Sequence, residues 1–233
     1  DKGVARGKLS QEEKEIVLSR IKGTTDLADL AEADLIIEAV TEDTEIKSQL
    51  FAELDAICPP HTILATNTSC LSVTRLAAAT KRRDRVLGIH FFNPAPVMLL
   101  VELVKTVLTS ESTLATAKEF VTSLGKTTVI ALDTPGFIVN RLLIPYLLDA
   151  VRLLQDGATT REDIDTAIKL GLNHPMGPLA LLDFIGLDTC LYIADAMYEE
   201  FRDPRYAAPP LLRRLVLAGC YGRKSGQGFY EYA

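Results

Sequence analysis

The stretch Thr127–Gly136, TTVIALDTPG, marks the point where the pattern of this chain changes. Its first six residues are rich in β-branched side chains and predict a strand, which the following Asp-Thr-Pro-Gly ends. Strand-like runs alternate with helical segments before this stretch, whereas only helical segments follow it. We therefore place a domain boundary near residue 133.

The residues before the boundary predict an α/β sheet. Asp34–Val40 is a short apolar run typical of a buried strand. Residues 44–57 carry apolar side chains at helical spacing, and the two prolines after Cys58 end that helix. Further strands are expected at Thr62–Thr66, Val86–Phe92, Leu99–Val104 and Thr127–Leu132, and further helices at about 72–79 and 112–124. Strands separated by helices favour mostly parallel pairing.

The residues after the boundary predict an all-α domain. Helical stripes run over about 136–155, 160–170, 178–200 and 208–219. Thr160, followed by an acidic residue at position 163, is a capping box that marks the start of one of these helices. The expected organisation is thus an α/β domain over residues 1–133 and a helical domain over residues 134–233.

The composition argues against a membrane-spanning protein, a nucleic-acid-binding protein and a secreted protein. A chain of 233 residues that is 48% hydrophobic can bury a core, and its apolar runs are far shorter than the roughly 20 residues of a membrane helix. The formal net charge of -6 gives no reason to expect a nucleic-acid partner. The charged N-terminal segment predicts no signal peptide. Four cysteines without C-x-x-C spacing favour reduced thiols in the cytoplasm or an organelle matrix, and we expect a cytoplasmic location.

Polar residues follow several predicted strands. Ligands of open α/β sheets bind beyond the carboxyl ends of the strands. Glu42 follows the first run, Asn67 and Ser69 follow the second, and His90 and Asn93 lie at the end of the third. Strand ends are also polar in sheets that bind nothing, so the pattern alone leaves a site and an ordinary sheet edge both open.

His90 and Glu102 are the two polar residues that interrupt apolar strands. A buried carboxylate is costly unless it is paired, and strands that follow one another in sequence usually lie side by side. Glu102 would then orient the imidazole of His90 and favour its protonated form. The pattern is equally compatible with a hydrogen-bonded core histidine and a glutamate on an edge strand.

A series of longer motifs resembles one enzyme family. The motifs occur in the order TNTS (66–69), GIHFFNPAPVM (88–98), VE (101–102), DTPGFIVNR (133–141), HPMGP (174–178) and GRKSGQGFY (222–230). Together they resemble the L-3-hydroxyacyl-CoA dehydrogenase family, most closely its short bacterial 3-hydroxybutyryl-CoA members. The likeness runs through the whole chain.

The resemblance implies NAD-dependent oxidation of a short-chain L-3-hydroxyacyl-CoA to the 3-ketoacyl-CoA, or the reverse reduction. By analogy with the family, His90 is the general base and Glu102 stabilises its imidazolium form. Ser69 and Asn140 match positions that bind the substrate oxygen and hold the site. Without the resemblance, Asn140 would be assigned to an exposed helix surface.

The resemblance also implies a cofactor, an acyl-CoA substrate and a homodimer formed through the helical domain. Contacts to NAD carry over to matched residues, here Glu42, Lys47, Asn67, Ser69, Asn93 and, with the weakest match, Lys224. The pattern around Glu42 and Lys47 is also that of an ordinary charged first helical turn. Acyl-chain length and reaction direction stay open.

The chain departs from the family at its N-terminus. The family begins with a strand, a G-x-G-x-x-G turn and a helix that bind the NAD pyrophosphate, whereas the first ten residues here resemble a later stretch. We expect residues 1–133 to be an N-terminally incomplete Rossmann-like domain, lacking about 60 residues, the size of two strand–helix units. NADP also stays open, because the ribose-reading position lies in that part. One alternative is an inactive fragment that only folds and dimerises, and another is a hydroxyacid dehydrogenase of the lambda-crystallin type.

Overall fold

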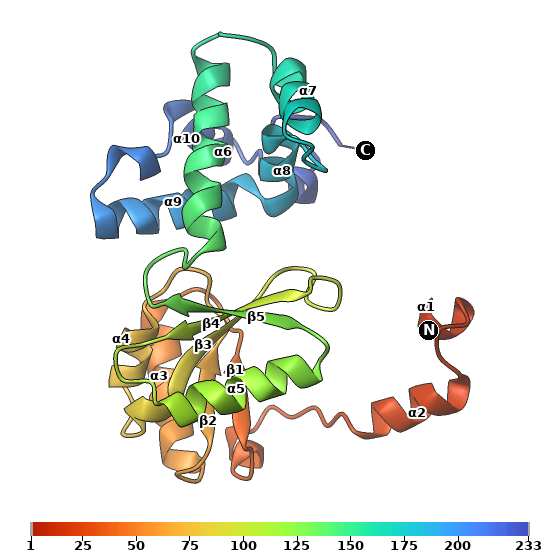
Figure 1. The fold of residues 1–233 in the computed structure, drawn as a ribbon, viewed down its shortest axis with the longest axis vertical. Helices are drawn as coiled ribbons and strands as arrows, with labels where there is room; N and C mark the ends of the chain where they lie inside the picture. The colour runs from red at the N-terminus through yellow and green to blue at the C-terminus, as the bar shows by residue number, and fades with distance from the viewer. Residues whose placement is uncertain (1, 233) are drawn as a thin grey trace.

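The computed structural model describes residues 2–232, which form a sheet domain and a helical domain joined near residue 136 (Figure 1). The strands are β1 (Leu35–Glu38), β2 (Ile63–Thr66), β3 (Val86–Phe91), β4 (Leu100–Lys105) and β5 (Thr127–Leu132). They lie side by side in the order β1-β2-β3-β4-β5. Pairing is parallel except between β3 and β4, which are joined by a loop that turns the chain back. The predicted, mostly parallel sheet is confirmed.

Helices cover both faces of the sheet. The helices of this domain are α3 (Thr44–Ile57), α4 (Val73–Ala78) and α5 (Glu111–Ser123), all within one residue of their predicted positions. Successive strand residues point to opposite faces. Leu64 and Val86 therefore pack with α3 and α4, whereas Ala65 and Leu87 pack with α5. The result is a three-layer domain with the carboxyl ends of β1 to β3 left free for a site.

Polar caps fix where these helices begin. Asp43 accepts a hydrogen bond from the Ile46 amide, 2.9 Å away, at the start of α3. Asp133, directly after β5, accepts from the first two amides of α4, those of Val73 (2.8 Å) and Thr74 (2.6 Å). The end of the last strand is thereby tied to the loop that follows β2.

The helical domain contains one helix of the predicted length, α7 (Arg161–Gly171), and others that are shorter than the sequence predicts. The others are α6 (Val139–Gln155), α8 (Pro178–Ile185), α9 (Leu187–Phe201) and α10 (Pro210–Leu217). The continuous stripe predicted over 178–200 is wrong, because Gly186 has φ +109° and separates α8 from α9. The helix expected from residue 136 begins at Val139, because Gly136 and Phe137 have positive φ. Buried leucines, a cysteine and a methionine from α6, α8 and α9 form the core of this domain.

One predicted cap is half formed. Thr160 caps α7 by accepting from the Asp163 amide at 3.1 Å. In a capping box the Asp163 carboxylate would also accept from the Thr160 backbone amide. Here it accepts from the Thr160 hydroxyl instead, at 2.8 Å, so the second bond of the box is absent from this pair.

The first residues form an arm that extends away from the sheet (Figure 1). It contains α1 (Lys2–Ala5) and α2 (Gln11–Ser19), and none of the α2 side chains is buried. Short 3₁₀ helices are η1 (Leu27–Leu30), η2 (Arg83–Arg85), η3 (Pro204–Tyr206) and η4 (Arg223–Ser225). Within residues 2–232, no helix combines the length and apolar character needed to cross a membrane.

Candidate active site

Three predicted site residues form one hydrogen-bonded chain. His90 and Glu102 are paired directly across β3 and β4, and His90 Nδ1 lies 2.8 Å from Glu102 Oε2. His90 Nε2 lies 3.1 Å from the hydroxyl of Ser69, which follows β2. An ionised carboxylate only accepts, so Nδ1 carries the hydrogen and Nε2 presents its lone pair to the Ser69 hydroxyl. The imidazole is held in the form that can take up a proton at Nε2.

The second oxygen of Glu102 binds the helical domain. Oε1 accepts from the backbone amides of Ile138 (3.0 Å) and Val139 (2.9 Å), at the start of α6. That helix has no side-chain cap of its own. Glu102, which is fully buried, therefore satisfies two amides of α6 that would otherwise lack a partner.

A cavity of about 590 Å³ opens beside this chain. Polar groups from both domains line it: Asn67, Ser69, His90 and Asn93 from the sheet domain, and Asn140 and Thr189 from the helical domain. Its apolar lining consists of Phe91, Phe92, Pro94, Val139, Leu143, Phe184, Ile185 and Ile193. The rings of Phe92 and Phe137 lie 4.7 and 5.5 Å from the His90 ring, so His90 is only 4% exposed. Five of the residues selected from sequence thus meet in one cavity.

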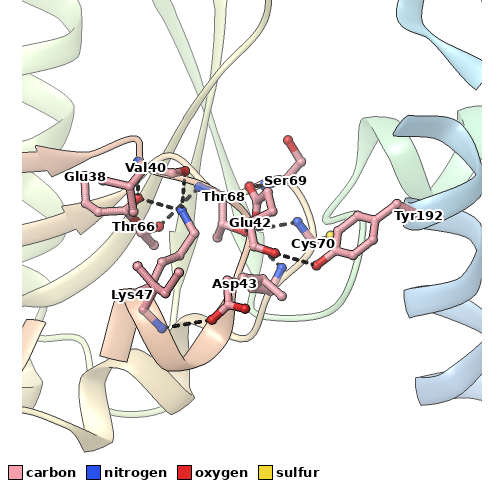
Figure 2. A network of polar contacts seen from close by, with 12 residues as sticks. Glu38, Val40, Glu42, Asp43, Lys47, Thr66, Thr68, Ser69, Cys70 and Tyr192 are labelled. Carbon is pink, nitrogen blue, oxygen red and sulfur yellow. Dashed lines mark hydrogen bonds and ion pairs between the residues drawn. The ribbon is translucent and has the colours of Figure 1, made fainter. Parts of the chain in front are cut away.

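Glu42 lies next to the cavity, in the network that Figure 2 shows. Its carboxylate accepts from the Thr68 hydroxyl at 2.7 Å and from the Ser69 amide at 3.2 Å. Asn67 uses its side-chain oxygen to accept from the Phe91 amide at 2.9 Å, which fixes the loop after β2 against β3. The side chain of Asn67 therefore has a structural bond in addition to its place in the cavity wall.

Besides Glu42, two further residues of the predicted cofactor set lie outside the cavity lining. Lys47 is 1% exposed, and its ammonium pairs with Glu38 at 2.6 Å in the network of Figure 2. Lys224 is exposed on η4 and pairs with Asp188 at 2.6 Å. Both ammonium groups already have a carboxylate partner, and their contacts to a cofactor stay a prediction.

Sequence reasoning missed several residues around the site. Glu38 was assigned only to a strand, although a carboxylate in the apolar run 34–40 is the same signal that singled out Glu102. The apolar wall contributed by α8 and α9 carries no local signal, because its residues are typical of any helix core. Within the described residues, no group of three His, Cys, Asp or Glu side chains could hold a metal ion.

Cys70 is buried beside this network, and its thiol is expected to be unreactive. Burial, followed by the charge of Glu42, raises the pKa of its thiol to about 12.

The basic segment at residues 81–85 has a structural role in part. Its Arg82 is nearly buried and pairs with Asp55 at 2.7 Å.

Comparison with known proteins gives consistent matches over both domains. The family model of the 3-hydroxyacyl-CoA dehydrogenase NAD-binding domain matches residues 1–134, and that of the 3-hydroxyacyl-CoA dehydrogenase C-terminal domain matches residues 136–232. A 3-hydroxybutyryl-CoA dehydrogenase of Mycobacterium tuberculosis is 52% identical over 234 residues, covering 100% of this chain and 82% of that protein. Human mitochondrial hydroxyacyl-coenzyme A dehydrogenase is 48% identical over 227 residues, covering 97% and 72%. The crystal structure of (S)-3-hydroxybutyryl-CoA dehydrogenase from Ralstonia eutropha matches with a TM-score of 0.96 at 45% identity, covering 100% and 82%.

Proposed function

The chain belongs to the 3-hydroxyacyl-CoA dehydrogenase family, and we propose that it interconverts short-chain L-3-hydroxyacyl-CoA and 3-ketoacyl-CoA with NAD. The observation that carries this proposal is the Ser69–His90–Glu102 chain at the edge of a cavity lined by both domains. The matches to both domain models favour an enzyme over an inactive fragment.

The groups at the sheet edge suit the nicotinamide and ribose of NAD. The Glu42 carboxylate accepts hydrogen bonds from hydroxyl groups, and the amides of Asn67 and Asn93 both donate and accept. These groups gather at the carboxyl ends of β1 to β3, where cofactors of open α/β sheets bind. Bound NAD would supply the hydride acceptor for the substrate.

The remaining chemistry belongs to residues of this chain. In the oxidation direction, Ser69 and Asn140 bind the 3-hydroxyl oxygen, and His90 Nε2 takes up the hydroxyl proton. Glu102 accepts from Nδ1 and balances the positive charge that forms on the ring. The Phe92 and Phe137 rings exclude water from this proton transfer. In the reduction direction, His90 returns the proton.

His90→Gln tests the proposed role. We expect reduction of acetoacetyl-CoA by NADH to fall about 10²–10⁴-fold, because the group that returns the proton to the substrate is lost while the packing is nearly kept. The matched control is His61→Gln, since the His61 side chain is exposed and its imidazole pairs with the exposed Asp34. Near wild-type turnover in His90→Gln, with an unchanged thermal midpoint, contradicts the role of His90.

The proposal extends to a cytoplasmic homodimer formed through the helical domain. An apolar groove of about 510 Å³ between α6 and α7 supports this arrangement. The groove contains the Tyr146 hydroxyl, which is buried without a hydrogen-bond partner among the described residues. The four cysteines are free thiols, which suits a reducing compartment.

A further inference from the structure

Tyr192 connects the helical domain to the edge of the sheet. Its side chain leaves α9, and its hydroxyl donates to the backbone carbonyl of Glu42 at 3.1 Å, across 150 positions of sequence. Figure 2 shows the phenol ring lying between α9 and the loop that follows β1. The bond therefore joins the two domains at a point far in sequence from the linker between them.

A buried ion pair stabilises the loop after β1, whose Glu42 carbonyl accepts this bond. Glu38 Oε1 accepts from the Val40 amide and from the Lys47 ammonium, both at 2.6 Å, and its other oxygen accepts from the Thr66 hydroxyl at 2.7 Å. The Lys47 ammonium also donates to the Val40 carbonyl at 3.2 Å. Breaking a buried ion pair of this kind strongly destabilises a fold. The pair therefore keeps the loop, and with it the Glu42 carbonyl, in a fixed position (Figure 2).

The side chain of Glu42 carries the connection to the reacting groups. Its carboxylate binds the Thr68 hydroxyl and the Ser69 amide, and the Ser69 hydroxyl bonds His90 Nε2. A single path of hydrogen bonds thus runs from α9 through Glu42 and Ser69 to the general base. The path enters the sheet domain at the residue that we assign to the cofactor.

The phenol is well suited to act as a donor. Burial, together with the Cys70 thiol and the Glu42 and Asp43 carboxylates, raises the pKa of Tyr192. The hydroxyl therefore keeps its proton at neutral pH and can donate it to the Glu42 carbonyl.

We propose that Tyr192 is a positioning residue for the cofactor, whose hydroxyl fastens α9 to the Glu42 carbonyl and so places the Glu42 carboxylate, and through its bond from the Ser69 amide the Ser69 side chain, for binding. The proposal rests on the proposed function, because that function assigns Glu42 and Ser69 to NAD. It adds a residue of the helical domain to a set of cofactor residues that is drawn mostly from the sheet domain.

Tyr192→Phe removes this one hydroxyl and keeps the ring. A single neutral hydrogen bond corresponds to a change of about 3–10-fold in binding. We expect the Kd for NADH, measured by fluorescence titration without substrate, and the KM for NADH to rise by about that factor. The kcat at saturating NADH and acetoacetyl-CoA should change less than about twofold, because binding rather than the chemical step is affected. The matched control is Tyr198→Phe, six residues further along the same helix, for which all three constants should stay at the wild-type values.

The outcomes separate the positioning role from a structural one and from the proposed function. A lower thermal midpoint in Tyr192→Phe with unchanged Kd and KM for NADH means that the hydroxyl only stabilises the fold, and it overturns the proposal. An equal loss in both tyrosine variants overturns it as well. A wild-type protein that binds NADH but does not reduce acetoacetyl-CoA contradicts the proposed function alone, and the comparison of Kd values then still decides the role of Tyr192. A wild-type protein that binds no NADH overturns both.

Discussion

Glu102 performs two tasks with the two oxygens of one carboxylate. Oε2 orients His90, and Oε1 accepts from the first amides of α6, the helix that carries Asn140. Because one rigid group makes both sets of bonds, the general base and the helical half of the cavity keep a fixed relation to each other. A buried carboxylate is stable here because both of its oxygens accept hydrogen bonds.

Glu102→Gln should separate the two tasks. The glutamine oxygen can still accept from the Ile138 and Val139 amides, but the glutamine NH₂ then points a donor at His90 Nδ1. His90 would adopt the tautomer with hydrogen on Nε2, which cannot take the substrate proton. We expect kcat for oxidation of L-3-hydroxybutyryl-CoA by NAD to fall about 10²–10⁴-fold with a small loss of stability.

Glu102→Ala is the comparison, since it also removes the bonds to α6. Its free energy of unfolding should fall about 3 kcal/mol further than that of Glu102→Gln, as determined by urea denaturation. Equal stability of the two variants would show that Oε1 contributes nothing to holding α6.

The predictability of individual site residues depends on whether a general rule of strand pairing brings the two partners together. His90 and Glu102 interrupt two consecutive strands, so their contact follows from the rule that such strands pair. The partner of Lys47 is Glu38, nine positions earlier, and their pairing depends on a turn whose shape no residue pattern specifies. Tyr192 and Glu42 meet only because two domains dock, which no local pattern encodes.

The spacing of apolar residues predicted the positions of the helices and strands well. It predicted less well whether a helix continues without a break. Strands β1 to β5 are recognisable because each is an apolar run bounded by turn residues. The break between α8 and α9 escaped prediction because the apolar spacing continues through Gly186, and only its backbone conformation interrupts the helix. A glycine within a periodic stripe can be a helix residue or a break, and the pattern alone does not distinguish them.

The groove between α6 and α7 is where the proposed homodimer can be tested. Leu153 lies on its α6 side and is 45% exposed, facing Ile164 and Ile168 of α7. We expect light scattering to give twice the chain mass of 25.5 kDa for the wild type and the single-chain mass for Leu153→Glu, because the charge would be buried at the interface. Leu217→Glu on α10 is the control, since Leu217 is 86% exposed and outside the groove. A dimeric Leu153→Glu variant would place the interface elsewhere.

The site is a property of the whole molecule. The sheet domain contributes Asn67, Ser69 and His90 to the cavity, and the helical domain contributes Asn140 and Thr189. Glu102 fixes the two domains near the linker, and Tyr192 connects them at the loop after β1. Stability and activity should therefore respond together to changes that loosen the sheet domain.

Acid stability should depend on the Asp55–Arg82 pair, which joins α3 to the segment before β3. Burial opposes ionisation of Asp55, but hydrogen bonds from the Lys81 amide and the Arg82 guanidinium outweigh it and lower the pKa of this carboxyl. A pKa lower in the folded than in the unfolded chain stabilises the fold above the unfolded value of about 3.9. That contribution is lost as the pH falls through the folded pKa. Asp55→Asn should therefore unfold about 1–2 kcal/mol more easily than the wild type at pH 7, with the gap closing below about pH 4.

Urea denaturation between pH 7 and pH 2.5 measures this gap. Asp34→Asn is the matched control, because the Asp34 side chain is 93% exposed and its removal should leave the stability unchanged at every pH. In the wild type, protonation of Asp55 abolishes its charge and makes the carboxyl resemble the amide of the variant, so the two proteins should converge in acid. A gap between wild type and Asp55→Asn that stays constant down to pH 2.5 would mean that the pair stabilises the molecule through packing and neutral hydrogen bonds, and not through the charge of Asp55.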